Sequence, residues 1–354
     1  MSAGPSPDGS LEAHAVWFAA PRTAELRRET VPPPAAGEVR VRSLVSAISH
    51  GTEMLVYRGE VPPDLPLDLP TLAGDFSFPI KHGYATVGRV MESGAEHLSS
   101  GDLVFVHHPH QELFTVPAAM PVPLPEGTGP ESGAFFANLE TALNVVHDTP
   151  LRLGETAVVF GQGVVGLLVT QLLERAGAAR VLAVDPMQRR RKLALEVGAD
   201  AAFEPGEDLS ERVLEATAGR GADVAVEASS SGAALQAAVD AVAAEGTVVV
   251  ASWYGTRPVT LSLGGHFHRG RVRVRSSQVG RVNPELGPRW DRERRVEAVL
   301  DLIPELRLEE LVSHRIPFEK APSAYRLLDE DPGETVQVLL SYDRLEIDPS
   351  GFIA

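Results

Sequence analysis

The sequence predicts an α/β protein in which a doubly wound parallel sheet is joined to an irregular antiparallel β-barrel. From about residue 131 onward, helical segments alternate with short strands that are apolar throughout, the pattern of a parallel sheet covered on both faces. Before that point, short strands are interrupted by clustered prolines, as in an irregular barrel. The length of 354 residues exceeds what one hydrophobic core usually serves and therefore favours two domains.

The predicted elements follow from these patterns in chain order. Alternating or apolar runs predict barrel strands over residues 38–48, 84–94, 102–109 and 112–118. The second half contains predicted helices over 131–149 and 164–178, with strands over 156–161, 181–185, 223–229 and 246–254. After Arg275 the pattern is less regular, with a helix over 292–306 and a closing strand over 335–342.

The composition excludes several classes of function. The chain is 44% hydrophobic and 23% charged, as in ordinary globular proteins. Its formal net charge of −16 disfavours nucleic acid as a partner and favours a small molecule, because phosphate backbones are bound through clustered Lys and Arg. The lack of cysteine excludes disulfides, Fe–S clusters and thiolate zinc sites. With no membrane helix or signal peptide pattern, we expect a cytoplasmic protein without membrane contact, and a disordered lead-in over residues 1–10.

A glycine-rich phrase between a predicted strand and a predicted helix predicts a dinucleotide site. It has the pattern G-x-G-x-x-G and consists of Gly161, Gln162, Gly163, Val164, Val165 and Gly166. Gly161 permits the tight turn, Gly163 lets the backbone approach a pyrophosphate, and Gly166 allows helix and strand to pack closely. The amino end of the helix then faces the phosphates with its N–H groups.

The cofactor preference is predicted from the end of the next strand. Asp185 lies about 20 residues past the glycine loop, where an acidic side chain binds the ribose hydroxyls and repels a 2′-phosphate, so NAD is favoured over NADP. Arg190, in the middle of an arginine triplet, offers the alternative of pairing with a 2′-phosphate, or lies on a solvated helix face.

Several further phrases carry a resemblance to a known family. They are Ser49-His50-Gly51-Thr52-Glu53, residues 83–88, Gly101-Asp102, the glycine loop with Asp185, and Glu227-Ala228-Ser229. With them the chain resembles the medium-chain dehydrogenase/reductase superfamily over nearly its whole length. Within it, residues 48–53, 78–88 and 108–114 are similar to the zinc-type alcohol dehydrogenase branch related to bacteriochlorophyllide- and threonine-dehydrogenase-like proteins.

The resemblance implies a domain arrangement and an activity. It implies a discontinuous GroES-like catalytic domain over residues 11–137 and 280–354 and a Rossmann NAD-binding domain over 138–279. It also implies a homodimer or homotetramer, and hydride transfer between a nicotinamide and an alcohol or carbonyl in the cleft between the domains. The residues expected to border the cofactor are Ala228, Ala251, Ser252, Trp253, Ser277 and Gln278.

The departures from the family pattern concern zinc. A gapless comparison puts His50, Tyr84 and Ala137 at the positions of the three catalytic zinc ligands, and alanine cannot ligate a metal. The four-cysteine lobe of a structural zinc site has no counterpart. We therefore expect a zinc-independent member without a metal. A replacement site at His108 and His110 is less favoured than a structural or substrate-facing loop.

Without a metal, hydrogen-bond donors must stabilise the charge on the substrate oxygen, and a general base must accept its proton. Tyr84 and His50 are the first candidates because they inherit the ligand positions. Thr52 holds the hydroxyl position that begins a proton relay in the family, and Glu53 either orients its neighbours or binds a basic partner within the barrel. For each residue the alternative is a structural role.

Two other functions remain open from the sequence. A quinone or enone reductase would also lack zinc, but such relatives generally favour NADPH, which Asp185 argues against. A noncatalytic dinucleotide-binding sensor or scaffold is the third alternative. Two basic clusters, over residues 269–275 and 289–295, are consistent either with a protected edge strand or with an anionic substrate site.

Overall fold

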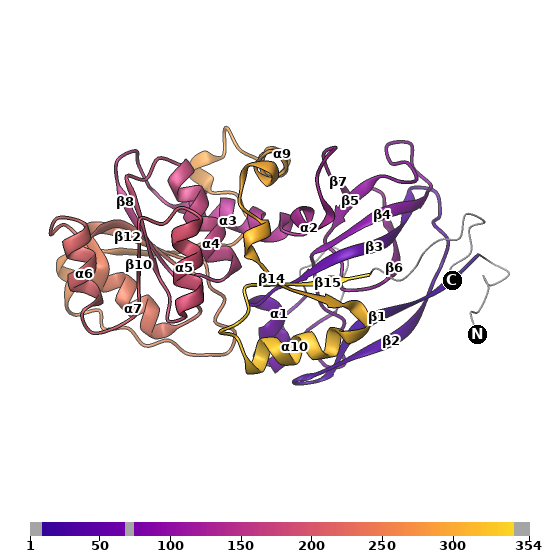
Figure 1. Ribbon diagram of the computed structural model, residues 1–354, viewed down its shortest axis with the longest axis horizontal. Helices are drawn as coiled ribbons and strands as arrows, with labels where there is room; N and C mark the ends of the chain where they lie inside the picture. Colours follow the sequence, from indigo (N-terminus) through magenta and orange to yellow (C-terminus); the bar gives the residue numbers. More distant parts are fainter. Residues whose placement is uncertain (1–8, 68–73, 343–354) are drawn as a thin grey trace. The chain divides into compact units, whose positions relative to one another are not determined.

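The computed structural model describes residues 9–67 and 74–342 and divides into two compact units (Figure 1). The first unit contains the chain up to Ala137 together with the chain from Val312, and the second contains Asn138–Leu311. Among the described residues, no helix combines the length and the apolarity needed to cross a bilayer. Of the expected disordered lead-in, only Gly9 and Ser10 lie within the described residues. Ser10 is buried there, and the Gly9 carbonyl accepts a hydrogen bond from Arg40.

The first unit is built on a seven-stranded sheet with the order β14-β15-β3-β4-β5-β7, in which β6 pairs with β3. Its strands are β3 (Glu38–Ile48), β4 (Thr86–Ser93), β5 (Leu103–Val106), β6 (Leu113–Pro117), β7 (Val122–Pro123), β14 (Val312–Pro317) and β15 (Gln337–Ser341). All pairings are antiparallel except that of β14 with β15. Alternate residues such as Val39, Val41 and Phe114 form an apolar core beneath β3 and β6.

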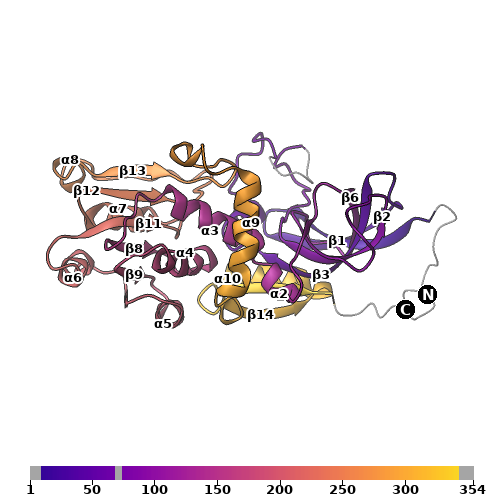
Figure 2. The same ribbon diagram turned by 90° about the horizontal axis from the view of Figure 1, so that it is seen from above.

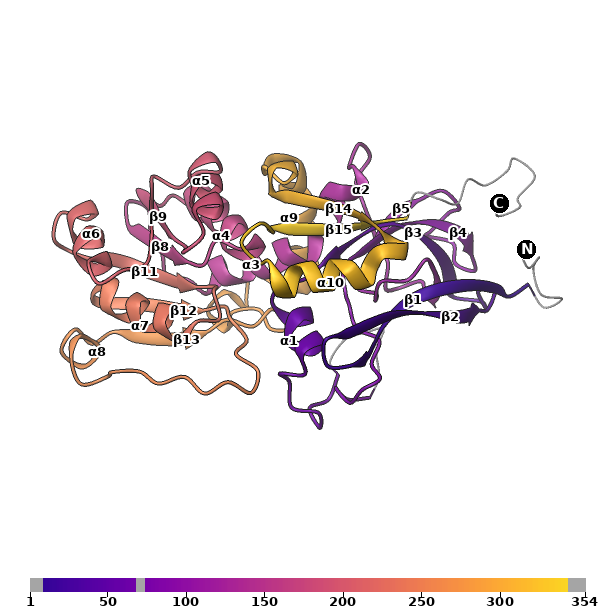
Figure 3. The ribbon, with the colours of Figure 1, turned by 60° about the horizontal axis from the view of Figure 1, so that its bottom comes forward.

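A separate two-stranded ribbon and several helices complete this unit. The ribbon pairs β1 (Leu11–Ala20) with β2 (Thr23–Val31), and the helices are α1 (Thr52–Arg58), α2 (Pro130–Gly133) and α10 (Ala321–Glu330). Figure 3 shows α10 running beside α1 and the ribbon. Helix α10 thereby brings Tyr325, which is distant in sequence, into contact with Phe18 and Tyr57.

The second unit contains a six-stranded parallel sheet with the order β10-β9-β8-β11-β12-β13. Its strands are β8 (Thr156–Phe160), β9 (Arg180–Val184), β10 (Ala201–Phe203), β11 (Ala222–Glu227), β12 (Val242–Val250) and β13 (Arg273–Ser276). The central strands are buried along their length, because helices cover both faces. The predicted fold class, a doubly wound parallel sheet with a separate β domain, is confirmed.

Helices flank this sheet in the pattern that right-handed crossovers produce. They are α3 (Phe136–Asp148), α4 (Val164–Arg175), α5 (Gln188–Glu196), α6 (Leu209–Ala216), α7 (Gly232–Ala241), α8 (His266–Arg269) and α9 (Arg292–Leu302). Helices α4 and α5 lie together on one side of the sheet, and α6 and α7 pack against each other on the other side (Figure 3). Strand β13 forms an edge next to β12 (Figure 2).

The boundary between the units differs from the expected return at residue 280. The structure keeps residues 280–311 with the parallel sheet and begins the return at Val312. The reason lies in α9, whose Arg295 is buried against α3. Its guanidinium donates to Glu140 Oε1 at 2.8 Å and to Asn144 Oδ1 at 2.8 Å. A buried, fully hydrogen-bonded ion pair of this kind ties α9 to the second unit.

Candidate functional site

The carboxyl ends of five parallel strands form a continuous row in the second unit. The residue after each strand donates its N–H to the last carbonyl of a neighbouring strand. These bonds run from Gly161 to Val184, Ala228 to Phe160, Ala251 to Glu227 and Ser277 to Val250, each 2.8 Å long. Ligands of open parallel sheets bind at this edge. The structure therefore brings Ala228, Ala251 and Ser277 to the same edge as the glycine loop.

The glycine loop joins β8 to α4 and has the geometry that a pyrophosphate requires. Gly161 has φ +90°, and a Cβ there would lie 2.8 Å from the Ala228 backbone. A Cβ on Gly166 would lie 1.8 Å from the Gly161 carbonyl, so α4 packs directly on the turn. At Gly163, the N-cap of α4, a Cβ would meet no protein atom within 4 Å. The space beside Gly163, at the amino end of α4, is therefore free of protein atoms and can accept a phosphate.

Two other members of the loop contribute differently. Gln162 is buried, and its side chain bonds the Val159 carbonyl and the Thr170 hydroxyl, so this side chain holds the loop to α4. Val165 is partly exposed at the start of the helix, whereas Val164 is buried.

Asp185 follows β9 and is fixed by backbone groups. One carboxylate oxygen accepts the Gln162 N–H at 2.7 Å, and the other accepts the Met187 N–H at 2.8 Å. The side chain is thereby anchored next to the glycine loop. Arg190 lies close enough for the Asp185 charge to act on it, although burial dominates and lowers the pKa of its guanidinium. The structure thus places Asp185, which favours NAD, close to Arg190, which would favour NADP.

A buried carboxylate, that of Glu227 from the Glu227-Ala228-Ser229 phrase, ends β11. Glu227 Oε2 accepts the Tyr254 hydroxyl at 2.7 Å, and Oε1 accepts the Ser229 N–H at 2.7 Å. Burial and this bond raise the pKa of Tyr254. Ser252 accepts the Ser230 N–H at 2.8 Å. Tyr254 is therefore held in the sheet edge by Glu227, while Trp253 is partly exposed beside it.

The segment after β13 and the two basic clusters are engaged by protein groups. Asn144 donates to the Ser277 hydroxyl at 3.2 Å, and the Gln278 side chain accepts the Gly280 N–H at 2.7 Å. Five of the eight arginines of the two clusters form ion pairs with carboxylates or stack on an aromatic ring, as the structural alternative expects. The pairs are Arg271 and Arg273 with Glu245, Arg275 with Asp148, Arg295 with Glu140, and Arg294 over Trp290.

In the first unit, the catalytic candidates come from two segments of the chain. His50 lies in the turn between β3 and α1, Thr52 is the first residue of α1, and Tyr84 comes from the segment before β4. The side chains of Ser49 and Thr52 act on the Tyr84 phenol and tend to lower its pKa. Burial, with a smaller contribution from the Glu53 charge, raises the pKa of Tyr84 to about 12. The phenol is therefore protonated at physiological pH and can act as a hydrogen-bond donor.

Glu53 lies at the centre of a buried polar network beneath this turn. Its carboxylate is fully buried and accepts His110 Nε2 at 2.9 Å, the Tyr325 hydroxyl at 2.8 Å and the Ser49 N–H at 2.9 Å. Gly83, with φ +145°, allows the chain before Tyr84 to pass over His110, since a Cβ there would lie 2.9 Å from the imidazole. Glu53 does bind a basic partner within the barrel, as one of the two alternatives predicted.

The neighbouring histidines do not assemble into a metal site. His108 stacks on Phe114 with ring centroids 3.7 Å apart, and His107 approaches the Tyr84 carbonyl at 3.2 Å. His82 lies edge-on to Tyr84, and burial lowers its pKa to about 4. Across residues 9–67 and 74–342, no group of three or more His, Asp or Glu side chains is placed to hold a metal ion. A catalytic zinc ion does not fit this donor set, because Ala137 has no ligand atom and the Tyr84 phenol is neutral.

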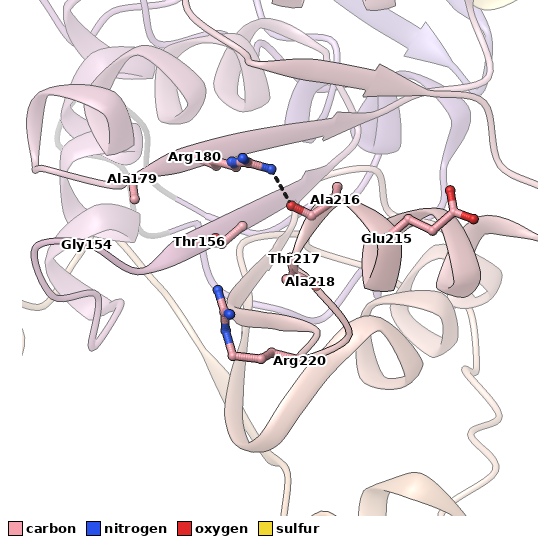
Figure 4. Close-up of a pocket in the computed structure, with 9 residues that line it drawn as sticks. All are labelled: Gly154, Thr156, Ala179, Arg180, Glu215, Ala216, Thr217, Ala218 and Arg220. Atoms are coloured by element: carbon pink, nitrogen blue, oxygen red, sulfur yellow. Dashed lines mark hydrogen bonds between the residues drawn. The ribbon is translucent and has the colours of Figure 1, made fainter.

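A cavity of about 250 Å³ lies at the opposite edge of the parallel sheet (Figure 4). It is lined by the amino ends of β8 and β9, including Thr156 and Arg180, and by Arg220. The Arg180 guanidinium donates to the Ala216 carbonyl across it. Because dinucleotides bind at the carboxyl edge of such sheets, this cavity is separate from the candidate cofactor site.

Comparisons with known proteins agree with this arrangement. The family model described as zinc-binding dehydrogenase matches residues 164–298. D-guloside 3-dehydrogenase of Escherichia coli strain K12 is 28% identical over 331 residues, which cover 87% of this chain and 93% of the relative. Both matches agree with the predicted resemblance to the medium-chain dehydrogenase/reductase superfamily.

Two solved structures share the fold. One is a zinc-binding dehydrogenase of Sinorhizobium meliloti 1021 bound to NADP, with a TM-score of 0.76 and 21% identity over 94% of this chain and 99% of that chain. The other is an alcohol dehydrogenase of Escherichia coli CFT073 complexed with NADH, also with a TM-score of 0.76, 21% identity and the same coverage. At this identity the likeness establishes the fold.

Proposed function

We propose that this chain is a zinc-independent oxidoreductase that transfers a hydride between NAD(H) and an alcohol or carbonyl substrate. The observation that carries the proposal is the complete dinucleotide loop of the second unit. The first unit adds a protonated Tyr84 at the position where the resemblance puts a zinc ligand. The alcohol and polyol dehydrogenase relatives support an oxidoreductase of this type.

The chain's own residues account for the binding of the cofactor. The N–H groups at the start of α4 would hold the pyrophosphate over Gly163, and the Asp185 carboxylate would lie beside the adenosine ribose. Since relatives of this fold bind NADP or NADH, a nicotinamide dinucleotide is supported, and the anchored Asp185 favours NAD(H). When bound, the nicotinamide supplies or accepts the hydride.

Tyr84 is the proposed source of the proton that the substrate oxygen takes up. During reduction, the Tyr84 hydroxyl donates a hydrogen bond and then its proton to the carbonyl oxygen. His50, from the turn that ends β3, is the residue that we assign to return a proton to Tyr84. Oxidation of an alcohol follows the same route in reverse.

The same proposal includes a cytoplasmic homodimer or homotetramer, which light scattering of the purified protein tests. An NADPH-dependent quinone or enone reductase is less favoured, because its cofactor would place a 2′-phosphate near Asp185. A noncatalytic sensor would bind the dinucleotide without turnover.

Hydride transfer is tested by following nicotinamide absorbance with NADH and NADPH against panels of alcohols, ketones and enones. We expect turnover of an alcohol or ketone with NADH. In the active protein, Tyr84→Phe should lower kcat about 100-fold and His50→Ala about 10-fold, since positioned acids contribute factors of this order. Binding of NADH without turnover on any panel favours the sensor, and unchanged turnover in both variants contradicts the roles of Tyr84 and His50.

A further inference from the structure

One side of α3 carries a stripe of buried polar side chains. Its members are Glu140, Asn144 and Asp148, which follow at a spacing of four residues and therefore share one side of the helix. The Arg295 guanidinium of α9 donates to Glu140 and Asn144. Arg275 of β13 donates to Asp148 Oδ1 at 3.2 Å. The stripe therefore fixes α3 to β13 and to α9, which lies beside it in Figure 2.

The side-chain amide of Asn144 is held in one orientation. Its Oδ1 accepts from Arg295 at 2.8 Å, and a guanidinium can only donate. Its Nδ2 lies 3.1 Å from Asp148 Oδ2 and 3.4 Å from the Gln278 carbonyl oxygen, which are acceptors. The same Nδ2 donates to Ser277 Oγ at 3.2 Å. A flipped amide would face a donor with its N–H groups and acceptors with its oxygen, so the partners fix which end of Asn144 faces Ser277.

The contact with Asn144 determines what the Ser277 hydroxyl can do. Because its oxygen accepts from Asn144, its O–H is left to donate. In the part of the chain that the structure describes, no side chain or carbonyl accepts this proton. Ser277 is partly exposed, and its N–H is bonded to the Val250 carbonyl at the carboxyl edge of the sheet. The hydroxyl is therefore a hydrogen-bond donor at the edge where ligands of such sheets bind.

The strand order indicates which part of a dinucleotide would meet Ser277. The glycine loop follows β8, and Asp185 follows β9 on one side of it. Strands β11, β12 and β13 lie on the other side, and Ser277 follows β13. With the pyrophosphate at the glycine loop and the adenosine ribose at Asp185, the nicotinamide half extends toward the ends of β11, β12 and β13. The carboxamide oxygen of that half is an acceptor that suits a hydroxyl donor.

We propose that the Ser277 hydroxyl donates a hydrogen bond to the carboxamide oxygen of the nicotinamide, and that Asn144 is the positioning residue that directs the Ser277 proton away from α3. Arg295, which is held by Glu140, keeps the Asn144 amide in the orientation that this requires. The proposal rests on the proposed function, because it concerns the cofactor of that activity.

Binding of NADH and of ADP-ribose to the full chain tests the contact, since ADP-ribose contains the adenosine and both phosphates but no nicotinamide. In calorimetric titrations, Ser277→Ala should raise the Kd for NADH about 10-fold, as the loss of one hydrogen bond does, and the Kd for ADP-ribose less than about twofold. Ser277→Thr keeps the hydroxyl and should bind NADH within about threefold of the parent protein.

Ser313→Ala is the matched control for these variants. It removes a hydroxyl that donates to the Gln337 carbonyl in the first unit, and it should leave both Kd values unchanged. An unchanged Kd for NADH in Ser277→Ala, or an equal loss for NADH and ADP-ribose, would overturn the contact.

A double-mutant cycle on the Kd for NADH tests the positioning role of Asn144. Asn144→Ala should weaken NADH binding with little effect on ADP-ribose, and its effect should largely disappear in the Ser277→Ala background, because both changes act through one hydroxyl. Asn283→Ala is the matched control, since Asn283 is a buried amide that donates to the His147 carbonyl of the same helix. It should weaken NADH and ADP-ribose equally or not at all. Independent effects of Asn144→Ala and Ser277→Ala would overturn the positioning role.

Asn144→Asp keeps the positioning role falsifiable if Asn144→Ala folds poorly by circular dichroism. The new carboxylate has the same shape and still accepts from Arg295, but it would accept the Ser277 proton instead of directing it outward. We expect a loss of NADH affinity at least as large as that of Ser277→Ala. Parent-like affinity for NADH in Asn144→Asp would contradict the proposal.

These binding measurements do not depend on turnover. A parent protein that binds NADH more tightly than ADP-ribose and reduces no substrate would contradict the proposed function, while the Ser277 variants would still decide the contact. A parent protein that binds NADH no more tightly than ADP-ribose would overturn the contact, whatever its turnover.

Discussion

At the residue scale, the site depends on hydroxyl and carboxylate groups that are held by backbone or by one another. Asp185 is held by the N–H groups of Gln162 and Met187, and Glu227 by the Tyr254 hydroxyl and the Ser229 N–H. Such second contacts decide whether a side chain keeps the geometry that its chemistry needs. They are also the part of the site that sequence patterns reveal least.

The Asp185 carboxylate is predicted to set the cofactor preference. Asp185→Asn keeps an acceptor oxygen but removes the negative charge, so the ratio of kcat/KM for NADPH to that for NADH should rise about 10-fold, the size of one charge-assisted hydrogen bond. Arg190→Gln is measured alongside, and it should change that ratio little. The prediction is contradicted if the parent protein prefers NADPH and Arg190→Gln loses that preference. Arg190, and not Asp185, would then determine which cofactor is bound.

The candidate residues could be predicted from the sequence where a motif fixes them. The glycine loop and Asp185 end consecutive strands of one βαβ unit, so the spacing between them predicts that they lie side by side. Glu227 with Tyr254 and Glu53 with Tyr325 were not predicted as pairs, because the partners of each pair are distant in sequence. Only the fold shows which hydroxyl reaches which carboxylate.

At the scale of elements, the loop between β8 and α4 restricts the residue type most strongly, because a side chain larger than hydrogen does not fit at Gly166. Gly166→Ala would place a methyl group against the Gly161 carbonyl, which should cost about 1–3 kcal/mol of stability and abolish NADH binding. Gly163→Ala introduces a methyl group that meets no protein atom within 4 Å, so stability should change by less than about 1 kcal/mol.

NADH binding separates the two glycine variants. The Gly163→Ala protein should keep its thermal midpoint while its Kd for NADH rises about 10-fold, because the methyl group occupies the space that a pyrophosphate would approach. Calorimetric titration and thermal melts measure both quantities. Unchanged NADH affinity in Gly163→Ala would place the pyrophosphate elsewhere.

The parallel sheet was predicted more completely than the barrel. Strand β8 lies within the predicted strand 156–161, and β9 and β11 each begin one residue before the predicted strands 181–185 and 223–229. The helix predicted over 131–149 is broken between α2 and α3 at Ala134 and Phe135, which periodicity does not reveal. The ribbon β1–β2, helix α10 and the parallel pairing of β14 with β15 were not predicted, because polar faces and long-range pairing obscure their pattern.

At the scale of the whole molecule, two buried histidines predict how stability depends on pH. Burial lowers the pKa of His82 to about 4 and that of His108 to about 3. The unfolded chain therefore takes up protons at these residues below about pH 6.5 while the folded chain does not, so stability is complete above that pH and falls as the pH drops. Each histidine contributes up to about 1.4 kcal/mol per pH unit in this window.

Urea unfolding at pH 7 and pH 5 measures this dependence. His108→Leu should lose about 2 kcal/mol less than the parent protein on going from pH 7 to pH 5. His268→Gln, at an exposed position, is the control and should follow the parent protein. An equal loss in His108→Leu and the parent would mean that His108 is protonated in the folded chain.

The central claim is that hydride transfer by this protein runs on protein groups without zinc. The most direct measurement is the turnover rate with NADH and its substrate after untagged protein has been dialysed against a chelator, with metal content determined by mass spectrometry on the same sample. We predict less than a tenth of an equivalent of zinc, as an order-of-magnitude bound, and an unchanged kcat. Loss of turnover on chelation, with recovery upon addition of one equivalent of zinc, would contradict the account.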